Sequence, residues 1–282
     1  MATNINGDTG IDKIQPGTVE AADIPDSTIT GAKLADATVS AAKLDTTYLT
    51  PTGDGSGLTG IAGGFSNMDV VTATGTWTNP GTVTKVKVTV VGGGGSGRSD
   101  MTTGTFVQYA GAGGGAAIEV VTIPTSPVSV TVGAGGAANS GATNGNTGGT
   151  SSFGAYCSAS GGQGGFSTTV PSAALSLAAV SKKSLGGIGS GGTINLQGGG
   201  GDAWRVDGVA TSGGAYSSSG GNSLLGYGGR SLWISTAPQT PSWNPVDNRN
   251  GSGYGAGGGA VTSNTTGRPS GAGVAGVVIV EY

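Results

Sequence analysis

Two carboxylates flank a tryptophan in the sequence GDAWRVDG, and they are the pair that best matches the chemistry of a glycosidase: Asp202 and Asp207, on either side of Trp204. Glycoside hydrolysis needs two facing carboxyl groups, one acting as general acid and the other as base or nucleophile. Solvated loop acids or caps of local turns explain these aspartates better. The chain also contains no histidine, which excludes Ser-His-Asp and Cys-His catalysis. We therefore expect no catalytic residue, with a polysaccharide depolymerase as the alternative.

A second motif, G-x-G-x-x-G at Gly92, Gly94 and Gly97, follows a predicted strand as it does in dinucleotide-binding folds. Those folds need a helix at this point and an acid about 20 residues later. The chain continues instead as RSDMTTGTFVQYAGAGGG, which opens no amphipathic helix. Calcium loops and Cys/His clusters are also missing from the sequence. We expect no cofactor and no metal site.

Basic residues are too scattered for a nucleic-acid partner. Phosphate binding needs clustered Lys and Arg, whereas only Lys182 and Lys183 are adjacent here. The net charge is −3, with eight acids and three lysines in residues 1–54 and seven acids and nine bases in residues 55–282. Solvated loop charge explains the lysine pair.

Aromatic rings and arginines that interrupt the glycine runs suit binding better than catalysis. Together with Ser, Gly and Asn they resemble the composition of antibody combining loops, in which rigid rings supply contact area at low entropy cost. Some rings are expected to pack inward, Trp77 and Tyr254 first among them, whereas Trp204 and Trp243 are expected to be exposed. The candidate receptor-contacting residues are Tyr109, Trp204, Arg205, Tyr216, Trp233, Trp243 and Arg249.

Glycine dominates the composition and limits the fold. The 282 residues include 61 glycines, while charged residues make up 10% and aromatic residues 5%. Collagen is excluded because glycine does not recur at every third position and prolines number only 11. Disordered linkers normally lack the β-branched runs found here. The fold class we predict is mainly β with irregular segments.

Several strands are visible in the sequence. Val83 to Val91 alternates apolar and polar residues, which predicts a half-buried strand. The runs Ala116–Ile123 and Val128–Val132 flank the connection PTSP and predict an antiparallel hairpin. The last strand, Val277–Tyr282, is expected to pair with the strand around Val88. Together they predict a small antiparallel sheet as the base of a body that starts at residue 67.

Between these strands lie glycine runs of about six residues, such as GGGGSG at Gly92 and GAGGGAA at Gly111. Such a run can adopt an extended left-handed helix of three residues per turn, which has no internal hydrogen bonds. Ordering glycine costs about 0.5–1 kcal/mol more per residue than ordering alanine. We therefore expect each run to bond to its neighbours on several sides, so that the core is hydrogen-bonded backbone.

The N-terminal region has a different pattern. Apolar residues recur every five positions in residues 1–50, at Ile14, Val19, Ile24, Ile29, Leu34, Val39, Leu44 and Leu49. A segment with one apolar line and small residues elsewhere must bury that line against other chains. We favour copies of itself, in a homotrimer. The alternative is that the segment becomes ordered only when it docks to a larger assembly. Residues 51–66 are rich in Gly and Pro and predict a spacer. Neither a signal peptide nor a bilayer-spanning run is visible, and the lone Cys157 is expected to be a buried, inert thiol.

A family resemblance rests on the order of several motifs: KVKVTVVGGGGSG, VSVTVGAGG, TSSFG, GSGYGAGGGA and GVVIVEY. In this order they resemble the glycine-rich domain of tailed-bacteriophage tail fibres and receptor-binding adhesins, over residues 68–282. The resemblance implies packed polyglycine-II-type helices whose surface loops, gathered at one end, recognise a bacterial cell-surface receptor, either a glycan or an outer-membrane protein. It carries over no catalytic residue.

The resemblance also implies a place for the protein. It would belong to the virion as a tail fibre, assembled in the host cytoplasm, with residues 1–50 bound to phage tail or baseplate proteins. Residues 67–282 would form the receptor-binding domain. A purely structural fibre or spacer is a further alternative.

Overall fold

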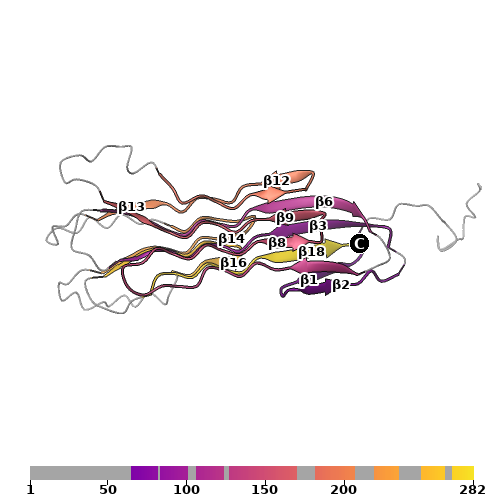
Figure 1. The fold of residues 1–282 in the computed structure, drawn as a ribbon, viewed down its shortest axis with the longest axis horizontal. Helices are drawn as coiled ribbons and strands as arrows, with labels where there is room; N and C mark the ends of the chain where they lie inside the picture. Colours follow the sequence, from indigo (N-terminus) through magenta and orange to yellow (C-terminus); the bar gives the residue numbers. More distant parts are fainter. Residues whose placement is uncertain are drawn as a thin grey trace, which may run out of the picture. The chain divides into compact units, whose positions relative to one another are not determined.

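A computed structural model describes residues 65–81, 83–100, 106–123, 127–169, 182–206, 219–234, 249–263 and 269–282. The chain divides into two compact units between Ala62 and Gly63. The described residues all belong to the second unit, so the period-five repeat of residues 1–50 lies outside them. They form β-strands and contain no helix (Figure 1), and hence no helix long and apolar enough to cross a membrane.

Two five-stranded antiparallel sheets form one end of this unit, which we call the base. The first base sheet contains, in spatial order, β1 (Met68–Val71), β18 (Val277–Glu281), β3 (Lys85–Val91), β6 (Ala116–Thr122) and β12 (Ile194–Leu196). The second contains β11 (Gly189–Ser190), β9 (Cys157–Ala159), β8 (Ser151–Phe153), β7 (Val128–Thr131) and β2 (Gly75–Trp77).

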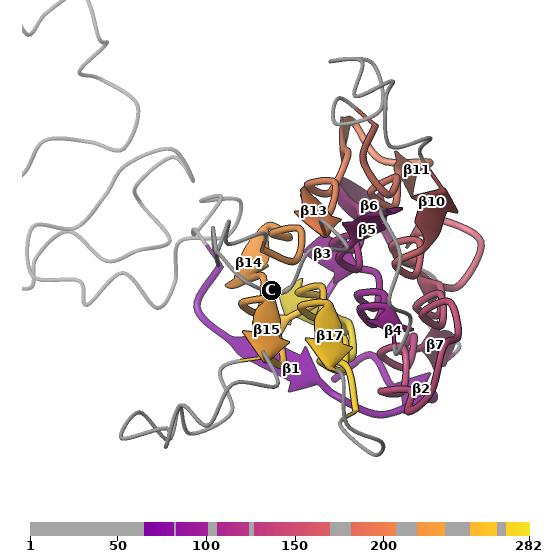
Figure 2. The ribbon, with the colours of Figure 1, turned by 90° about the vertical axis from the view of Figure 1, so that its left-hand side faces the viewer.

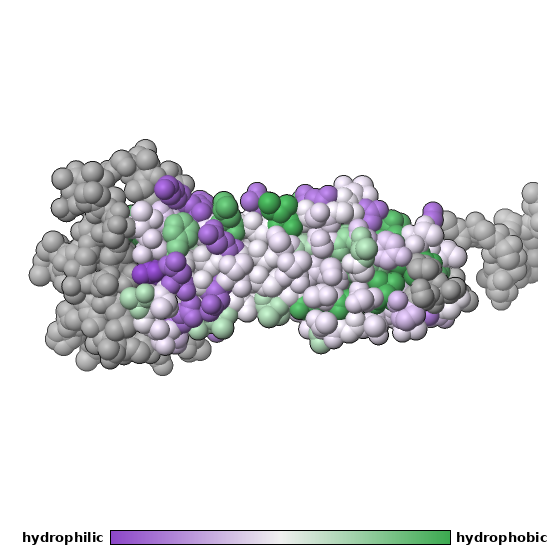
Figure 3. Space-filling model, viewed as in Figure 1, coloured by the Kyte–Doolittle hydropathy of each residue, from purple (hydrophilic) through white to green (hydrophobic). Residues whose placement is uncertain are grey.

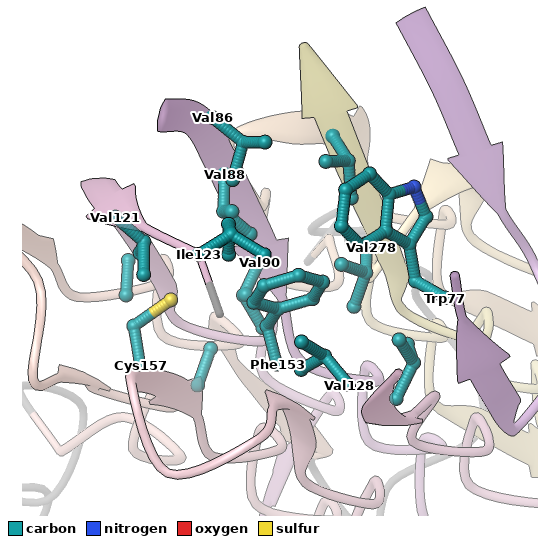
Figure 4. Close-up of a cluster of buried hydrophobic side chains, with 14 residues drawn as sticks. Trp77, Val86, Val88, Val90, Val121, Ile123, Val128, Phe153, Cys157 and Val278 are labelled. Carbon is teal, nitrogen blue, oxygen red and sulfur yellow. The ribbon is translucent and has the colours of Figure 1, made fainter. Parts of the chain in front are cut away.

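A conventional apolar core lies between the two base sheets (Figure 4). Alternate residues of β3, Val86, Val88 and Val90, are fully buried and face Phe153 of the second sheet. Each such side chain contributes about 1.5–3 kcal/mol when it leaves water. Trp77 is 4% exposed, which confirms its predicted inward position. Its ring packs against Phe153 and Tyr282 at centroid distances of 5.9 Å.

The pairing of the base strands confirms one sequence-based prediction and overturns another. The C-terminal strand β18 lies beside β3, with Val280 opposite Val88, as predicted. The predicted hairpin of residues 116–132 is wrong, because β6 belongs to the first sheet and β7 to the second. The chain therefore passes from one sheet to the other between Thr122 and Val128. Both strands carry alternating apolar residues that face the same core, so their pattern does not distinguish a sandwich from a hairpin.

Glycine runs continue from the base strands and form a middle zone. The run Gly92–Gly97 is buried throughout, and its six amides donate to three neighbouring segments in rotation, at 2.8–3.0 Å. The first and fourth amides donate to residues 115 and 112, the second and fifth to 149 and 146, and the third and sixth to 274 and 271. Donors that return to the same neighbour every three residues bond on three sides, as expected for glycine runs without internal hydrogen bonds.

A second buried run, residues 110–115, repeats this rotation. Its amides donate to residues 199 and 202, 255 and 258, and 160 and 163, at 2.8–3.1 Å. Its carbonyl oxygens accept bonds from Gly95, Gly187 and Gly221, which belong to three further segments. Six neighbours thus surround this run. Backbone hydrogen bonds, rather than side chains, hold the middle zone together.

Beyond the glycine runs lie two three-stranded sheets at the end we call the tip, which faces the viewer in Figure 2. One is antiparallel and contains β10 (Ser167–Thr169), β5 (Phe106–Tyr109) and β13 (Ala203–Val206). The other is parallel and contains β15 (Leu232–Ile234), β17 (Val261–Ser263) and β4 (Ser99–Asp100).

One further strand pair, β14 (Leu225–Tyr227) with β16 (Ser252–Tyr254), lies closer to the base. Its Tyr254 is partly buried against Val91, Ala116 and Val277, on the face of the first base sheet that points away from the sandwich core. This ring therefore packs inward, as predicted, although not completely.

Candidate functional site

Five of the connecting segments between strands begin at the tip. Residues 101–105, 170–181, 207–218, 235–248 and 264–268 each follow a tip strand, respectively β4, β10, β13, β15 and β17. The chain returns from these segments at the start of β5 or just beneath the tip strands. For example, Asp202, next to β13, donates its amide hydrogen to the carbonyl oxygen of Ser219. Five connecting segments are thus anchored at one end of the unit.

The fold assigns five of the seven sequence-predicted contact residues to the tip. Trp204 and Arg205 lie in β13, opposite Gln108 and Val107 of β5, and Trp233 lies in β15. Arg249 directly follows one connecting segment and donates a hydrogen bond from Nη1 to the carbonyl oxygen of Pro269. Tyr109 is the fifth. Tyr216 and Trp243 lie outside the described residues, in the segments that follow β13 and β15.

The interpretation of Tyr109 as a receptor-contacting residue is wrong. Its side chain is fully buried in β5, and its ring stacks on Phe166 with centroids 4.3 Å apart. Burial raises the pKa of the phenol above its usual range, while a hydrogen bond with Thr168 acts in the opposite direction. The alternation of FVQY, with Val107 and Tyr109 on one face, was the available signal for an inward ring. Tyr109 supports the tip from beneath.

Gln108 is a structural residue of the tip that sequence reasoning missed. Its side chain is 1% exposed, and Nε2 donates to the carbonyl oxygens of Val261 at 2.9 Å and Arg98 at 3.0 Å. Val261 belongs to β17 and Gln108 to β5, so this amide joins the two tip sheets. The sequence contains no signal for this role, because a single glutamine in a short strand is normally exposed, and only the structure shows that its buried amide has partners.

A cluster of amide side chains surrounds Arg98 near the tip. Arg98 Nη1 donates to Asn144 Oδ1, and Asn139 Nδ2 donates to the carbonyl oxygen of Asn144 at 2.6 Å. Asn146 Nδ2 donates to Asn139 Oδ1 at 2.9 Å. Hydrophilic side chains gather next to the tip in Figure 3, whereas the middle zone is mostly close to neutral, with a few hydrophobic side chains along its upper edge. Amides and guanidinium groups offer donors and acceptors that suit polar ligands.

The acids considered for catalysis are not assembled among the described residues. Asp202 forms an ion pair with Lys183 at 2.8 Å and accepts a hydrogen bond from Ser219 at 3.2 Å. Asp207 lies outside the described residues. Within the described ranges, no three His, Cys, Asp or Glu side chains come together as a metal site would require. The carboxylate of Asp202 is thus engaged in a local network on the surface.

The G-x-G-x-x-G pattern has a structural explanation. Every amide from Gly92 to Gly97 already donates to a neighbouring carbonyl oxygen, and the whole run is buried. A phosphate would need these amides free at a helix N-terminus. This run is therefore part of the core and not a nucleotide site.

One known protein family matches almost all of the unit described above. The family model described as a glycine-rich domain matches residues 69–282, from β1 to the C-terminal residue. The chain belongs to the glycine-rich domain family. The match spans the base sheets, the glycine runs and the tip strands of the domain. No curated protein matches the chain.

Proposed function

We propose that the glycine-rich domain is the receptor-binding part of a bacteriophage tail fibre, which attaches the virion to a bacterial cell through the segments at the tip. The observation that carries this proposal is the convergence of five connecting segments on one end of the domain. Binding residues concentrate on loops held by a rigid scaffold. The tip candidates that remain are Trp204, Arg205, Tyr216, Trp233, Trp243 and Arg249.

The scaffold in this proposal consists of polyglycine-II-type helices. Support comes from the period-three rotation of hydrogen-bond partners in residues 92–97 and 110–115. Because the stabilising groups are backbone amides and carbonyls, the scaffold does not depend on particular side chains in the tip segments. Their sequences are then free to vary with the receptor while the scaffold keeps its form.

The receptor is proposed to be a surface glycan or an outer-membrane protein. Rings with a polar edge suit both, since they bury apolar area and still offer a hydrogen bond. Individual contacts of this kind are weak. Several copies on one virion raise the effective concentration at the cell surface, so weak sites give stable attachment. The proposal includes a homotrimer, with residues 1–50 bound to phage tail or baseplate proteins.

Labelled full-length protein, screened against a panel of bacterial strains, tests the proposal. We expect binding to at least one strain, and loss of that binding when Trp204 and Trp243 are both replaced by alanine. Tyr227→Ala is the matched control, because this ring on β14 is 75% exposed and is not part of the tip. Unchanged binding by the double variant would exclude these two rings, and binding to no strain would favour a structural fibre or spacer.

The same preparation distinguishes a depolymerase from a binder. The protein is incubated with envelope glycans from the strain that it binds, and soluble saccharides are measured. We expect no release. Released oligosaccharide that disappears in an Asp202→Asn Asp207→Asn variant would establish a tailspike enzyme instead.

A further inference from the structure

The first base sheet has an outer face that points away from the sandwich core. Register places Val70, Ile279, Thr89, Ile118 and Ile194 side by side in one row across all five strands. Their sequence neighbours Val88, Val278, Val280 and Ala117 belong to the buried core. Because successive strand residues point to opposite faces, the row lies on the outside.

Part of this face is covered and part is bare. Tyr254 covers the row of Val91, Ala116 and Val277, which is fully buried. In the next two rows the face is open mainly at its margins, where most side chains are apolar, whereas in its middle Thr89 is 8% exposed and Ile118 and Ile279 are half-buried. The exposed fractions are 60% for Met68, 45% for Val70, 53% for Val120 and 48% for Ile194.

This area carries one positive and one negative side chain, which form an ion pair with each other. Lys87 and Glu281 lie opposite one another in adjacent strands and form an ion pair at 2.7 Å, with side chains 38% and 27% exposed. The pair stands in the row of Met68 and Val120. We call the set of residues that forms this area the outer face: Met68, Val70, Lys87, Ile118, Val120, Ile194, Ile279 and Glu281.

The size of the outer face limits what could cover it. Five strands at about 4.8 Å spacing and two rows of side chains give an area of roughly 300 Å². A stable dimer of free molecules buries about 800 Å² on each partner. The outer face is therefore too small to hold two free molecules together, but large enough to contribute when another part of the chain already joins the copies.

The entry point of the chain supplies such a connection. Residues 1–64 join the domain at Phe65, which directly precedes β1, and β1 is the edge strand of the outer face. Copies joined through residues 1–50 would be tethered to one another by a connection that enters each domain next to β1. Tethering raises their effective concentration, so a small contact suffices. A paired Lys and Glu also let identical faces meet without net repulsion.

We propose that the outer face is the contact between glycine-rich domains of the trimer, with the three copies turning this face towards a common axis. The inference rests on the homotrimer included in the proposed function. A second copy of this chain, rather than a virion protein, is the occupant. The tip strands take no part in this contact and remain available to the receptor.

Spin labelling of the full chain tests the contact directly. Val120→Cys places a label on the outer face, and Thr131→Cys places one on the exposed side of β7, in the second base sheet. The native Cys157 is buried and does not compete for the reagent. We expect a trimer in light scattering, with an immobilised, spin-coupled label at position 120 and a mobile, isolated label at position 131. A trimer in which both labels are mobile and isolated would overturn the proposal.

A charge variant supplies a second measurement. Ile194→Glu with Val120→Glu should raise the concentration at which the full-chain trimer half-dissociates by at least tenfold, whereas Thr131→Glu should leave it unchanged. The proposal would be overturned if the trimers of both variants half-dissociated at the same concentration. A wild-type chain that is monomeric at all concentrations would overturn it too, yet receptor binding at the tip would survive if the monomer still bound cells.

Discussion

Gly94 lies so close to Ala256 that a Cβ atom on Gly94 would come within 2.0 Å of the Ala256 carbonyl oxygen. The obstacle is backbone, which cannot rotate away as a side chain can. Comparable clashes with carbonyl oxygens would occur at Gly93, Gly97 and Gly114, at 2.0–2.2 Å. Glycine is thus required in the middle zone because neighbouring chains approach one another too closely for any side chain.

Gly94→Ala should destabilise the domain by more than about 3 kcal/mol, since overpacking costs about 1–3 kcal/mol even where side chains can adjust. Such a loss is a large part of the 5–15 kcal/mol that typically stabilises a domain. Gly75→Ala is the matched control, because nothing lies within 4 Å of a Cβ at that position. Urea unfolding of both variants measures the difference. Equal stability of the two variants would mean that the glycine runs are not closely packed.

Gln108→Met should loosen the tip without unfolding the base. Methionine keeps most of the side-chain volume but removes the amide that donates to the carbonyl oxygens of Val261 and Arg98. Leaving these buried oxygens without this donor should lower the stability of the tip by about 1–3 kcal/mol. Hydrogen–deuterium exchange should become faster in β5 and β17 and stay the same in β3 and β18. Asn195→Ala, in the exposed edge strand β12 of the first base sheet, is the control. An equal increase in exchange rate in the tip strands and the base strands of the Gln108 variant would contradict the assignment of this residue to the joint between the tip sheets.

Cys157 should react very slowly with thiol reagents in the folded protein. Burial raises the pKa of its thiol to about 11, and the charge of Glu119 acts in the same direction. At pH 8 the reactive thiolate is then about 100-fold scarcer than in a free cysteine. The reaction rate with an aromatic disulfide reagent, compared between native and urea-unfolded chains, should differ by at least that factor. Similar rates would show that this part of the core opens readily.

The base should lose stability at alkaline pH. Burial and the neighbouring carboxylate of Asp69 raise the pKa of the Tyr282 phenol, and Asp69 also accepts a hydrogen bond from Trp77 Nε1 at 2.8 Å. A raised pKa favours the neutral phenol in the folded state. The contribution is therefore complete below the usual tyrosine pKa of about 10 and is lost as pH rises through the folded value. Thermal unfolding between pH 8 and 12 measures this loss, which should be smaller in Asp69→Asn.

The strands of the base were largely predictable because their side chains carry the signal. The alternation of Val86, Val88 and Val90 located β3, and the apolar C-terminal run located β18 together with its partner. The crossing between β6 and β7 was not predictable, since a four-residue connection fits both a hairpin and a step between two sheets. Local pattern fixes which side chains are buried, but not which sheet receives them.

The glycine zone and the tip were less accessible to sequence reasoning. The need for hydrogen-bonded neighbours followed from the composition, whereas the partners of Gly92 to Gly97 did not, because glycine has no side chain that specifies register. Tyr109 was assigned to a binding loop because it adjoins a glycine run, although FVQY is a strand. Gln108 was overlooked because a single glutamine carries no periodic signal.

Amide hydrogen exchange of the full-length protein tests the central claim most directly, which is that buried glycine runs form the core beneath the tip. Exchange would be followed by mass spectrometry over peptides that cover residues 92–97 and 110–115, with β3 as the internal reference. We predict that both runs exchange as slowly as β3, since all of their amides donate to neighbouring carbonyl oxygens. Complete exchange of these runs within seconds, as in a flexible glycine linker, would contradict the account.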